Sequence, residues 1–407
     1  MRASSARAVV PLLAATVALV CCLGIAEEEK KMDAAPMPAP KIERDKAGAV
    51  TLTAEPGVEI RYWLVGPHAT PSSVRYEAPF PLPAGGTVKA LAIAPDGSKR
   101  VLDEKSLASA EFPAIEGAVP PQPVKPPPHE AGWADIKPAP PPHSPPYQGG
   151  DKGEVPFEPA KRVNDDWPLS DQENKGGWVK YEPMSDEFNG DKLDETKWWP
   201  FNPTWKGRYP GLFRKENVTL SGGQMHLTMK KEPIPATETD KKYKDYTCAA
   251  VQSKDTVRYG YFEVRSRAMK SAGSSSFWFY HSTKPWWTEI DVYEIGGKAP
   301  GKERNHHITM HVFHTPNEKK HWQVGSHFLA PANLCDDYHV FGLEWDEKEL
   351  KFYFDGVLVR KGPNTHWHQP LTLNFDSETM PEWFGMPKDE DLPSTFSVEY
   401  IRAWKRK

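Results

Sequence analysis

Three carboxylates lie within six residues, in the run EIDVYE at positions 289–294. The apolar and aromatic residues between the acids favour a buried strand, which Pro285 precedes and two glycines at 296–297 follow. Because side chains alternate along a strand, Glu289 and Asp291 share one face, and Glu294 joins them only if a β-bulge inserts one extra residue. With that bulge the two glutamate carboxyls would lie about 5 Å apart, the separation found in retaining glycosidases.

This spacing suits hydrolysis of a glycosidic bond by two carboxyl groups. One glutamate would attack the anomeric carbon, while the other would protonate the leaving oxygen and later activate water. Asp291 between them would hold a proton or a hydrogen bond and keep the two pKa values apart. The alternative is a solvated edge strand whose three acids have no catalytic role. The aromatic flanks at 277–280 and 286–287 argue against that alternative.

The run EIDVYE resembles the E-x-D-x-x-E signature of glycoside hydrolase family 16 in its bulged form. Other segments resemble the same family in the same order: SDEFNG at 185–190, YGYFEVR at 259–265, FW at 277–278, the hairpin between 339 and 356, and EYIRAW at 399–404. The resemblance covers residues 178–404 and implies a β-jelly roll with a long open cleft. It also implies an endo-acting, retaining β-glycosidase in which Glu289 is the nucleophile, Glu294 the general acid/base and Asp291 the helper.

A loop rich in glycine and proline, NPTWKGRYPGLFRKEN at 202–217, could contact the sugar chain. Exposed aromatic rings stack on sugar faces, and arginine binds hydroxyls, carboxylate or sulfate. The alternative is a loop that its own aromatics hold on the core. Resemblance adds a strand histidine that contacts the catalytic acids or the substrate, although a lone strand histidine is more often structural. The predicted substrate-binding residues are Trp205, Arg208, Trp278, Trp287, His311 and Glu378.

Resemblance also bears on the substrate. Laminarinases of the bulged branch usually carry Met where this chain has Tyr293, and the segments WKGRYPGLF and NFDSETMPEWFG resemble enzymes that cleave algal galactans. Arg208, Arg214 and Lys215 would suit a sulfated polymer. We therefore expect an agar, porphyran or carrageenan type of galactan. The alternatives are an endo-β-1,3-glucanase, a transglycosylase and a carbohydrate-binding protein without activity, although the presence of all three acids argues against the last.

No metal or cofactor is predicted for the reaction. His306 and His307 are adjacent, but no carboxylate-rich spacing typical of a metal site accompanies them. A structural calcium ion is implied by resemblance alone. The formal net charge of −4 gives no general attraction to nucleic acid, so the predicted partner is a polysaccharide, bound by a monomer.

The chain of 407 residues is long enough for two modules and a linker. Residues 1–26 read as a signal peptide, with a basic start, an apolar run at 9–23 and a small-x-Ala site at 24–26. We therefore expect a secreted, periplasmic or cell-surface protein that has no membrane contact once the signal is cleaved; the alternative is an uncleaved anchor. Outside the signal the chain keeps two cysteines, Cys248 and Cys335, which could form a disulfide or remain buried thiols.

Three regions follow the signal peptide. Residues 42–113 contain short alternating strands and resemble the fibronectin-like module at the C-terminus of chitobiase-like enzymes, so a small β-sandwich is expected there. Residues 114–165 are dense in proline and predict an extended polyproline II linker. Residues 166–407 contain short alternating strands with almost no helical periodicity. The predicted fold class is all-β, with a β-jelly-roll catalytic domain behind a small β module.

Overall fold

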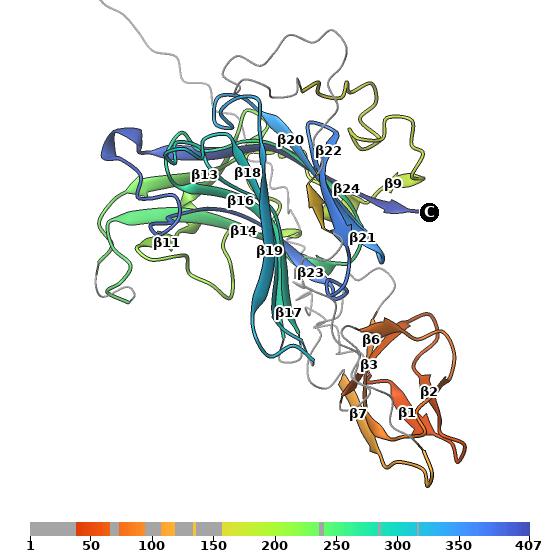
Figure 1. Cartoon of the computed structure of the whole chain (residues 1–407). Coiled ribbons are helices and arrows are strands. Elements are labelled where there is room, and N and C mark those ends of the chain that lie inside the picture. Colours follow the sequence, from red (N-terminus) through yellow and green to blue (C-terminus); the bar gives the residue numbers. More distant parts are fainter. Residues whose placement is uncertain are drawn as a thin grey trace, which may run out of the picture. The chain divides into compact units, whose positions relative to one another are not determined.

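The computed structural model describes residues 38–65, 73–93, 107–118, 133–135, 157–235, 240–283, 286–315 and 317–407 (Figure 1). Within these residues the regular elements are β-strands and three short 3-10 helices, η2 (Glu182–Met184), η3 (Lys215–Asn217) and η4 (Asp389–Asp391). The all-β fold class is therefore confirmed. The predicted signal peptide and most of the proline-rich segment lie outside the described residues. In the described part of the chain, no helix has the length and apolar character needed to span a bilayer.

The described residues between 38 and 118 form two small antiparallel sheets. One has the order β1 (Lys41–Arg44), β2 (Ala49–Thr53), β5 (Phe80–Pro81), and the other β4 (Val74–Arg75), β3 (Glu59–Val65), β6 (Gly86–Ile93), β7 (Leu107–Phe112). Alternating apolar residues of both sheets meet in one core, built from Val50, Leu52, Ile60, Leu82, Val88 and Ala90. Tyr62 stacks on Phe80 with ring centroids 4.2 Å apart, so this aromatic side chain packs within the small module.

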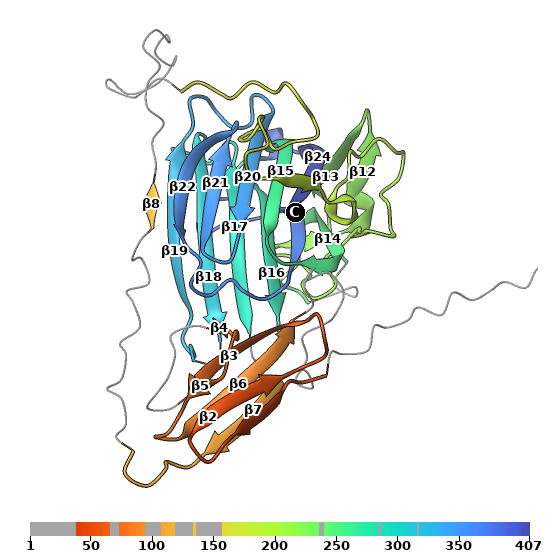
Figure 2. The same ribbon diagram turned by 90° about the vertical axis from the view of Figure 1, so that its right-hand side faces the viewer.

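The remaining strands pair into two large layers that pack face to face, and the layer without the EIDVYE run is called the outer layer. Its order is β12 (Val218–Ser221), β13 (Gln224–Lys231), β24 (Ser394–Arg406), β15 (Gly260–Arg267), β20 (His339–Trp345), β21 (Glu349–Phe354), β22 (Val357–Pro363) and β8 (Ala134–Asp135), all antiparallel. The short strand β9 (Trp178–Lys180) also pairs with β24. Figure 2 shows β22, β21, β20 and β15 side by side in this layer.

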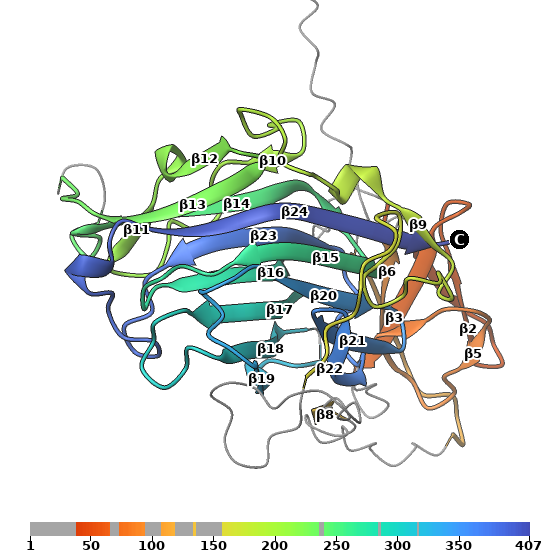
Figure 3. The same ribbon diagram turned by 90° about the horizontal axis from the view of Figure 1, so that it is seen from above.

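The second layer, called the cleft layer below, carries the EIDVYE run. Its order is β10 (Trp198–Trp199), β14 (Tyr246–Val257), β23 (Leu371–Glu378), β16 (Ser274–Ser282), β17 (Trp287–Gly296), β18 (Asn305–His314) and β19 (Trp322–Leu329), again antiparallel. The short strand β11 (Gly211–Phe213) joins β14 in parallel. Figure 3 shows β16, β17, β18 and β19 following one another.

The main core lies between the two layers. Phe262 of β15 meets Phe279 of β16 with ring centroids 4.9 Å apart, and Tyr293 of β17 meets Phe341 of β20 at 4.3 Å. Burial of each large apolar side chain stabilises the fold by about 1.5–3 kcal/mol relative to exposure. The alternating strands read from the sequence therefore form a jelly-roll sandwich, as predicted.

Part of the predicted linker is packed on the outer layer. Residues 157–177 are here called the strap. They begin at Phe157, which belongs to the main core, and its ring centre lies 5.4 Å from that of Phe354. Further along, the Leu169 N–H donates to Glu263 at 2.6 Å, and Arg162 pairs with the same carboxylate. Within the segment predicted as an extended spacer over 114–165, Phe157 and Arg162 are therefore held on the catalytic domain by these contacts.

Cys248 and Cys335 are both buried free thiols. This decides between the two alternatives that the sequence left open. Burial raises the pKa of the Cys248 thiol well above its ordinary value, which keeps the group protonated and unreactive.

Candidate active site

The predicted bulge is present in β17. On the β16 side, Trp278 pairs with Asp291 while the preceding Phe277 pairs with Tyr293, so Val292 has no partner on that strand. The β18 side shows a register shift at the same place. Two residues of β17 therefore occupy the space of one, as a β-bulge requires.

The bulge sorts the side chains of β17 between two faces. Val292 and Tyr293 are consecutive, yet both are fully buried in the main core. Glu289, Asp291 and Glu294 all line one cavity on the opposite side of the strand. A regular strand would have sent Glu294 into the core with its apolar neighbours, so the bulge is what brings the third acid to the other two.

The three acids form the centre of a cleft. On one side they line a cavity of about 430 Å³ together with Thr204, Trp205, Arg208, Ser276, Trp278, Tyr280, Ser282, Trp287, Phe313, Asp376 and Glu378. On the other side they line a second hollow of about 620 Å³ that extends to Tyr209, His311, Gln323, Glu382 and Trp383. The cleft thus continues in both directions from the acids.

Burial and mutual repulsion perturb the two glutamates. Burial raises the pKa of Glu289 well above its ordinary value, and the charges of Asp291 and Glu294 raise it further. Burial likewise raises the pKa of Glu294, with Asp291 and Glu378 adding to the effect. Neighbouring carboxylates in a poorly solvated site cannot all ionise cheaply, so the site retains a proton at a pH where free glutamate has lost it.

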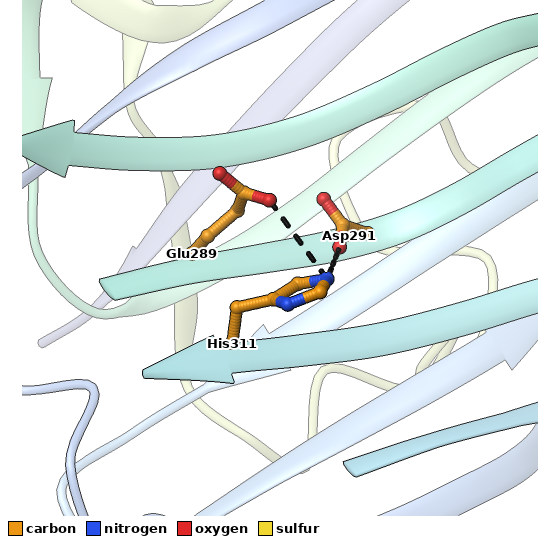
Figure 4. A group of neighbouring side chains, drawn as sticks. All are labelled: Glu289, Asp291 and His311. Carbon is orange, nitrogen blue, oxygen red and sulfur yellow. Dashed lines mark ion pairs between the residues drawn. The ribbon is translucent and has the colours of Figure 1, made fainter. Parts of the chain in front are cut away.

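His311 of β18 reaches the acids from the neighbouring strand (Figure 4). Its Nε2 lies 3.3 Å from Asp291 Oδ2 and 4.0 Å from Glu289 Oε1. Its other nitrogen, Nδ1, lies 3.0 Å from His321 Nε2, and the ring is nearly parallel to that of Phe313. The imidazole is therefore held from behind while it faces the carboxylates, which is the arrangement of an orienting group.

Arg208 enters the cavity as part of an ion pair. Its Nε lies 3.0 Å from Glu378 Oε2, and its guanidinium carbon lies 5.9 Å from the ring centre of Trp205. Burial raises the pKa of Glu378 to about 7, although Arg208 works in the opposite direction. Arg214 and Lys215 are not among the described residues that line either hollow. The expected basic cleft is thus reduced to one arginine, and the carboxylates of the site outnumber it.

Aromatic side chains form the walls on either side of the acids. Trp278 donates its indole N–H to Asp376 Oδ2 at 2.5 Å and meets Trp205 edge to face at 6.2 Å. Trp287 stacks on Phe313 with ring centroids 4.2 Å apart. All the predicted substrate-binding residues except His311 line the first cavity, and His311 lines the second hollow.

Two separate regions of the chain match known protein families. Residues 178–406 match the family model described as the GH16 domain of β-porphyranases A–D, and residues 50–105 match the model described as Fn3 associated. The chain belongs to glycoside hydrolase family 16. The span of the family 16 match agrees with the resemblance found in the sequence, and the second match agrees with the expected fibronectin-like module.

Individual members of family 16 give a consistent result. β-Porphyranase B of Zobellia galactanivorans is 30% identical over 252 residues, which cover 56% of this chain and 85% of that protein. κ-Carrageenase of Pseudoalteromonas carrageenovora is 27% identical over 263 residues, which cover 56% of this chain and 64% of that protein. The crystal structure of the Zobellia porphyranase B superposes with a TM-score of 0.50, at 27% identity, over 56% of this chain and 92% of that one.

In this family 16 domain, Tyr293 does not contact the cleft. It is fully buried, and its hydroxyl lies 2.7 Å from Ser266 Oγ in the outer layer. A residue on the core face cannot touch a sugar bound on the other face of β17. Tyr293 therefore bears on the substrate only by resemblance, and the arginine loop remains the part of the sequence argument that faces the cleft.

Several residues of the family 16 cleft were not identified from the sequence. Asp376 and Tyr280 line the first cavity, Phe313 lines both hollows, and His321 backs His311. Alternation along β23 could have found Asp376, since it lies two residues before Glu378 and so shares its face. His321 follows a loop, and no local pattern marks it.

A cation could fit in the same place as the acids. Possible ligand atoms of Glu289, Asp291 and His311 lie within 4.8 Å of one another. A cation there would occupy Glu289, the nucleophile expected from the sequence, and would compete with a substrate for that carboxylate. His306 and His307 cannot form a pair of ligands, because His306 is directed into the core and His307 packs beside Trp383.

Proposed function

We propose that this family 16 hydrolase is exported and cleaves an algal β-galactan internally, with retention of the anomeric configuration. The observation that supports this most strongly is the bulge of β17, which gathers Glu289, Asp291 and Glu294 on one face. The hollows on both sides of the acids would admit the middle of a polymer, which is what endo-cleavage needs.

The first chemical step uses both glutamates. The Glu289 carboxylate attacks C1 of the sugar while protonated Glu294 gives its proton to the glycosidic oxygen. The bond between C1 and that oxygen breaks, the shortened chain leaves with a free hydroxyl, and an ester joins C1 to Glu289. The raised pKa of Glu294 supports this role, because the acid must carry its proton at the working pH.

The second step releases the product. Glu294, now ionised, takes a proton from water, the water oxygen attacks C1, and the ester to Glu289 breaks. Two inversions at C1 return the original configuration. Asp291 keeps the pKa of Glu294 high through its charge, and Nε2 of His311 on the neighbouring strand lies 3.3 Å from Asp291 Oδ2.

Porphyran is our first candidate among the galactans. It is supported by the matched family model and by the names of the relatives rather than by the net charge of the cleft. Arg208 is the cation of the first cavity, and its half-exposed guanidinium could receive a sulfate or a hydroxyl group of the sugar. Carboxylates elsewhere in the cavity would instead favour neutral sugar units beside it.

The test is the release of reducing ends from porphyran, agarose, κ-carrageenan and laminarin, with Glu289→Gln as the inactive reference. We expect cleavage of one galactan, a mixture of oligosaccharides early in the reaction, and β-anomers as the first products by ¹H NMR. Cleavage of laminarin alone would overturn the galactan proposal. Initial α-anomers would overturn retention, and binding without cleavage of any polymer would favour a carbohydrate-binding protein.

Export and a monomeric state are part of the same proposal. Export is supported by the basic and apolar pattern of residues 1–26 and by the insolubility of gel-forming galactans, which an enzyme must reach outside the cell. Expression of the whole chain should give a mature protein that begins after residue 26. Recovery of the uncleaved chain in the membrane fraction would favour an anchor instead.

A further inference from the structure

The bulge of β17 leaves Val292 without a partner on β16 inside the main core, and a histidine side chain bonds to the backbone of that residue. His306 of β18 is fully buried, and its Nε2 lies 2.8 Å from the backbone oxygen of Val292, the unpaired residue of the bulge. Because the acceptor is a carbonyl, Nε2 must carry the proton. Burial lowers the pKa of His306 to about 3, so the ring is neutral and serves as a fixed donor.

A second hydrogen bond holds the other residue of the bulge. The Tyr293 hydroxyl lies 2.7 Å from Ser266 Oγ, and both groups are buried. Ser266 belongs to β15 in the outer layer, at a register shift between β15 and β24. The register shift at Ser266 in the outer layer is thus hydrogen-bonded across the core to the bulge of β17 at Tyr293.

We infer that His306, Tyr293 and Ser266 are positioning residues that clamp the bulge and so fix the carboxyl of Glu294 over the cleft. This inference rests on the proposed function. Glu294 directly follows the two bulged residues, so any change in their backbone moves its Cα and carboxyl. Catalytic groups need placement within about 0.5 Å, a precision that packing and supporting hydrogen bonds supply together.

The clamp acts on one glutamate and not on the other. Glu289 lies before the bulge in regular pairing, opposite Tyr280 of β16 and His311 of β18. Loss of the clamp should therefore impair proton transfer by Glu294 while the nucleophile keeps its place. A general loss of packing would impair both functions together, which makes the two cases separable.

The experiment compares His306→Phe with His306→Gln. Phenylalanine keeps the ring volume and removes the donor, whereas the amide N–H of glutamine can reach the position of Nε2. On the polymer we expect His306→Phe to lower kcat by about 10- to 100-fold, part of the 10²- to 10⁴-fold that general acid–base catalysis supplies. His306→Gln should recover most of this loss.

The dependence of the rate on the leaving group reports directly on proton donation by Glu294. An aryl glycoside of the cleaved galactan oligosaccharide needs little protonation, so its kcat/KM should fall less than about threefold in His306→Phe, in contrast with the polymer. Azide should raise the kcat of this variant by replacing the water that Glu294 activates, as it should in Glu294→Ala. The basic limb of the pH profile should also move in His306→Phe and return in His306→Gln.

His339→Phe is the matched control. His339 also packs beside Phe354, but its Nδ1 bonds to Asp355 at 2.9 Å and makes no bond to β17. This variant should keep kcat and the pH profile whatever its thermal stability. If His306→Phe does not fold, Tyr293→Phe and Ser266→Ala each remove one hydroxyl and should lower kcat on the polymer by about three- to tenfold, again with a smaller effect on the aryl glycoside.

Equal losses on polymer and aryl glycoside, no response to azide, or Gln no better than Phe would overturn the clamp. The clamp would also be overturned if His306→Phe kept the kcat and pH profile of the wild type. If His306→Phe does not fold, the same result in Tyr293→Phe and Ser266→Ala would overturn the clamp. These outcomes differ from failure of the proposed function, in which the wild-type enzyme cleaves no glycan or Glu294→Ala keeps its activity.

Discussion

Two regions of the catalytic domain contain glutamates with little solvent around them, fully buried in the outer layer and partly buried in the cleft layer, and their surroundings differ. In the outer layer, Glu263 is fully buried and accepts hydrogen bonds from the Leu169 N–H at 2.6 Å and the Tyr400 hydroxyl at 3.0 Å, beside Arg162. In the cleft layer, the carboxylates of Glu289 and Glu294 accept no hydrogen bond from any residue that the structure describes. Burial raises the pKa of the glutamates in both regions, but in the outer layer Arg162 and the hydrogen-bond donors counter part of the rise.

The difference shows how to separate a structural acid from a reactive one. A buried carboxylate whose oxygens are satisfied fastens two segments together, here the strap and β15. A partly buried carboxylate left without donors is costly to the fold and keeps its oxygens available to a substrate. Each prediction below tests one side of this comparison.

The largest expected effect is on the activity of Glu289→Gln. Loss of a nucleophile should lower kcat by at least about 10⁴-fold, while the fold survives because the amide removes repulsion among neighbouring carboxylates. Reducing-end assays and thermal unfolding on the same samples would check both halves. A Tm equal to or above that of the wild type is expected, and a variant that is both inactive and unfolded would place Glu289 with the structural acids.

Glu263→Gln should have the opposite effect, a loss of stability without a loss of activity. Removal of one partner from a buried ion pair should lower the free energy of unfolding by about 2–4 kcal/mol, with kcat of the folded enzyme unchanged. Chemical denaturation gives this number. Glu399→Gln is the control in the same layer, because Glu399 pairs with Arg265 at a half-exposed position and should change stability by less than about 1 kcal/mol.

Asp291→Asn should change the pH profile in a defined direction. The charge of Asp291 raises the pKa of Glu294, so its removal lowers that pKa and Glu294 loses its proton at lower pH. The basic limb of kcat/KM should therefore move toward acid, together with a fall in kcat. A profile of unchanged position at lower rate would mean that Asp291 acts only by contact.

Removal of metal ions should have the smallest effect on activity, whereas addition of a metal ion should inhibit the enzyme. Treatment with a chelator should change kcat by less than about twofold, since the proposed steps involve no metal. Added Zn²⁺ should inhibit by competing with substrate at Glu289, Asp291 and His311. Loss of activity on chelation, restored by one cation, would contradict the proposed chemistry, whereas a lower Tm alone would point to a structural ion such as calcium.

Local pattern accounts for what could be predicted from the sequence. Alternation of apolar and polar residues predicts the strands. The spacing of Glu289, Asp291 and Glu294 places all three acids on one face only if the strand contains a bulge, and the pairing of β16 with β17 contains it. The main parts of the fold follow from such patterns, because strand alternation is set by which face is buried.

The features that escaped prediction depend on distant partners. Arg162 and Glu263 are 101 residues apart, and composition alone places Arg162 in the linker predicted over 114–165. Tyr293 was interpreted through its likeness to other sequences, but its bond to Ser266, 27 residues away, gives it a place in the core. No spacing rule reveals such contacts, since each depends on the register between strands that are far apart in the chain.

The most direct test of the central claim is to trap the ester on Glu289. A 2-deoxy-2-fluoro glycoside of the cleaved galactan, with a good leaving group, should form a covalent enzyme that turns over slowly. Peptide mass spectrometry should locate the sugar on Glu289, and Glu294→Ala should still be labelled. A sugar found on Glu294, or an active enzyme that is never labelled, would contradict the assignment of the two glutamates.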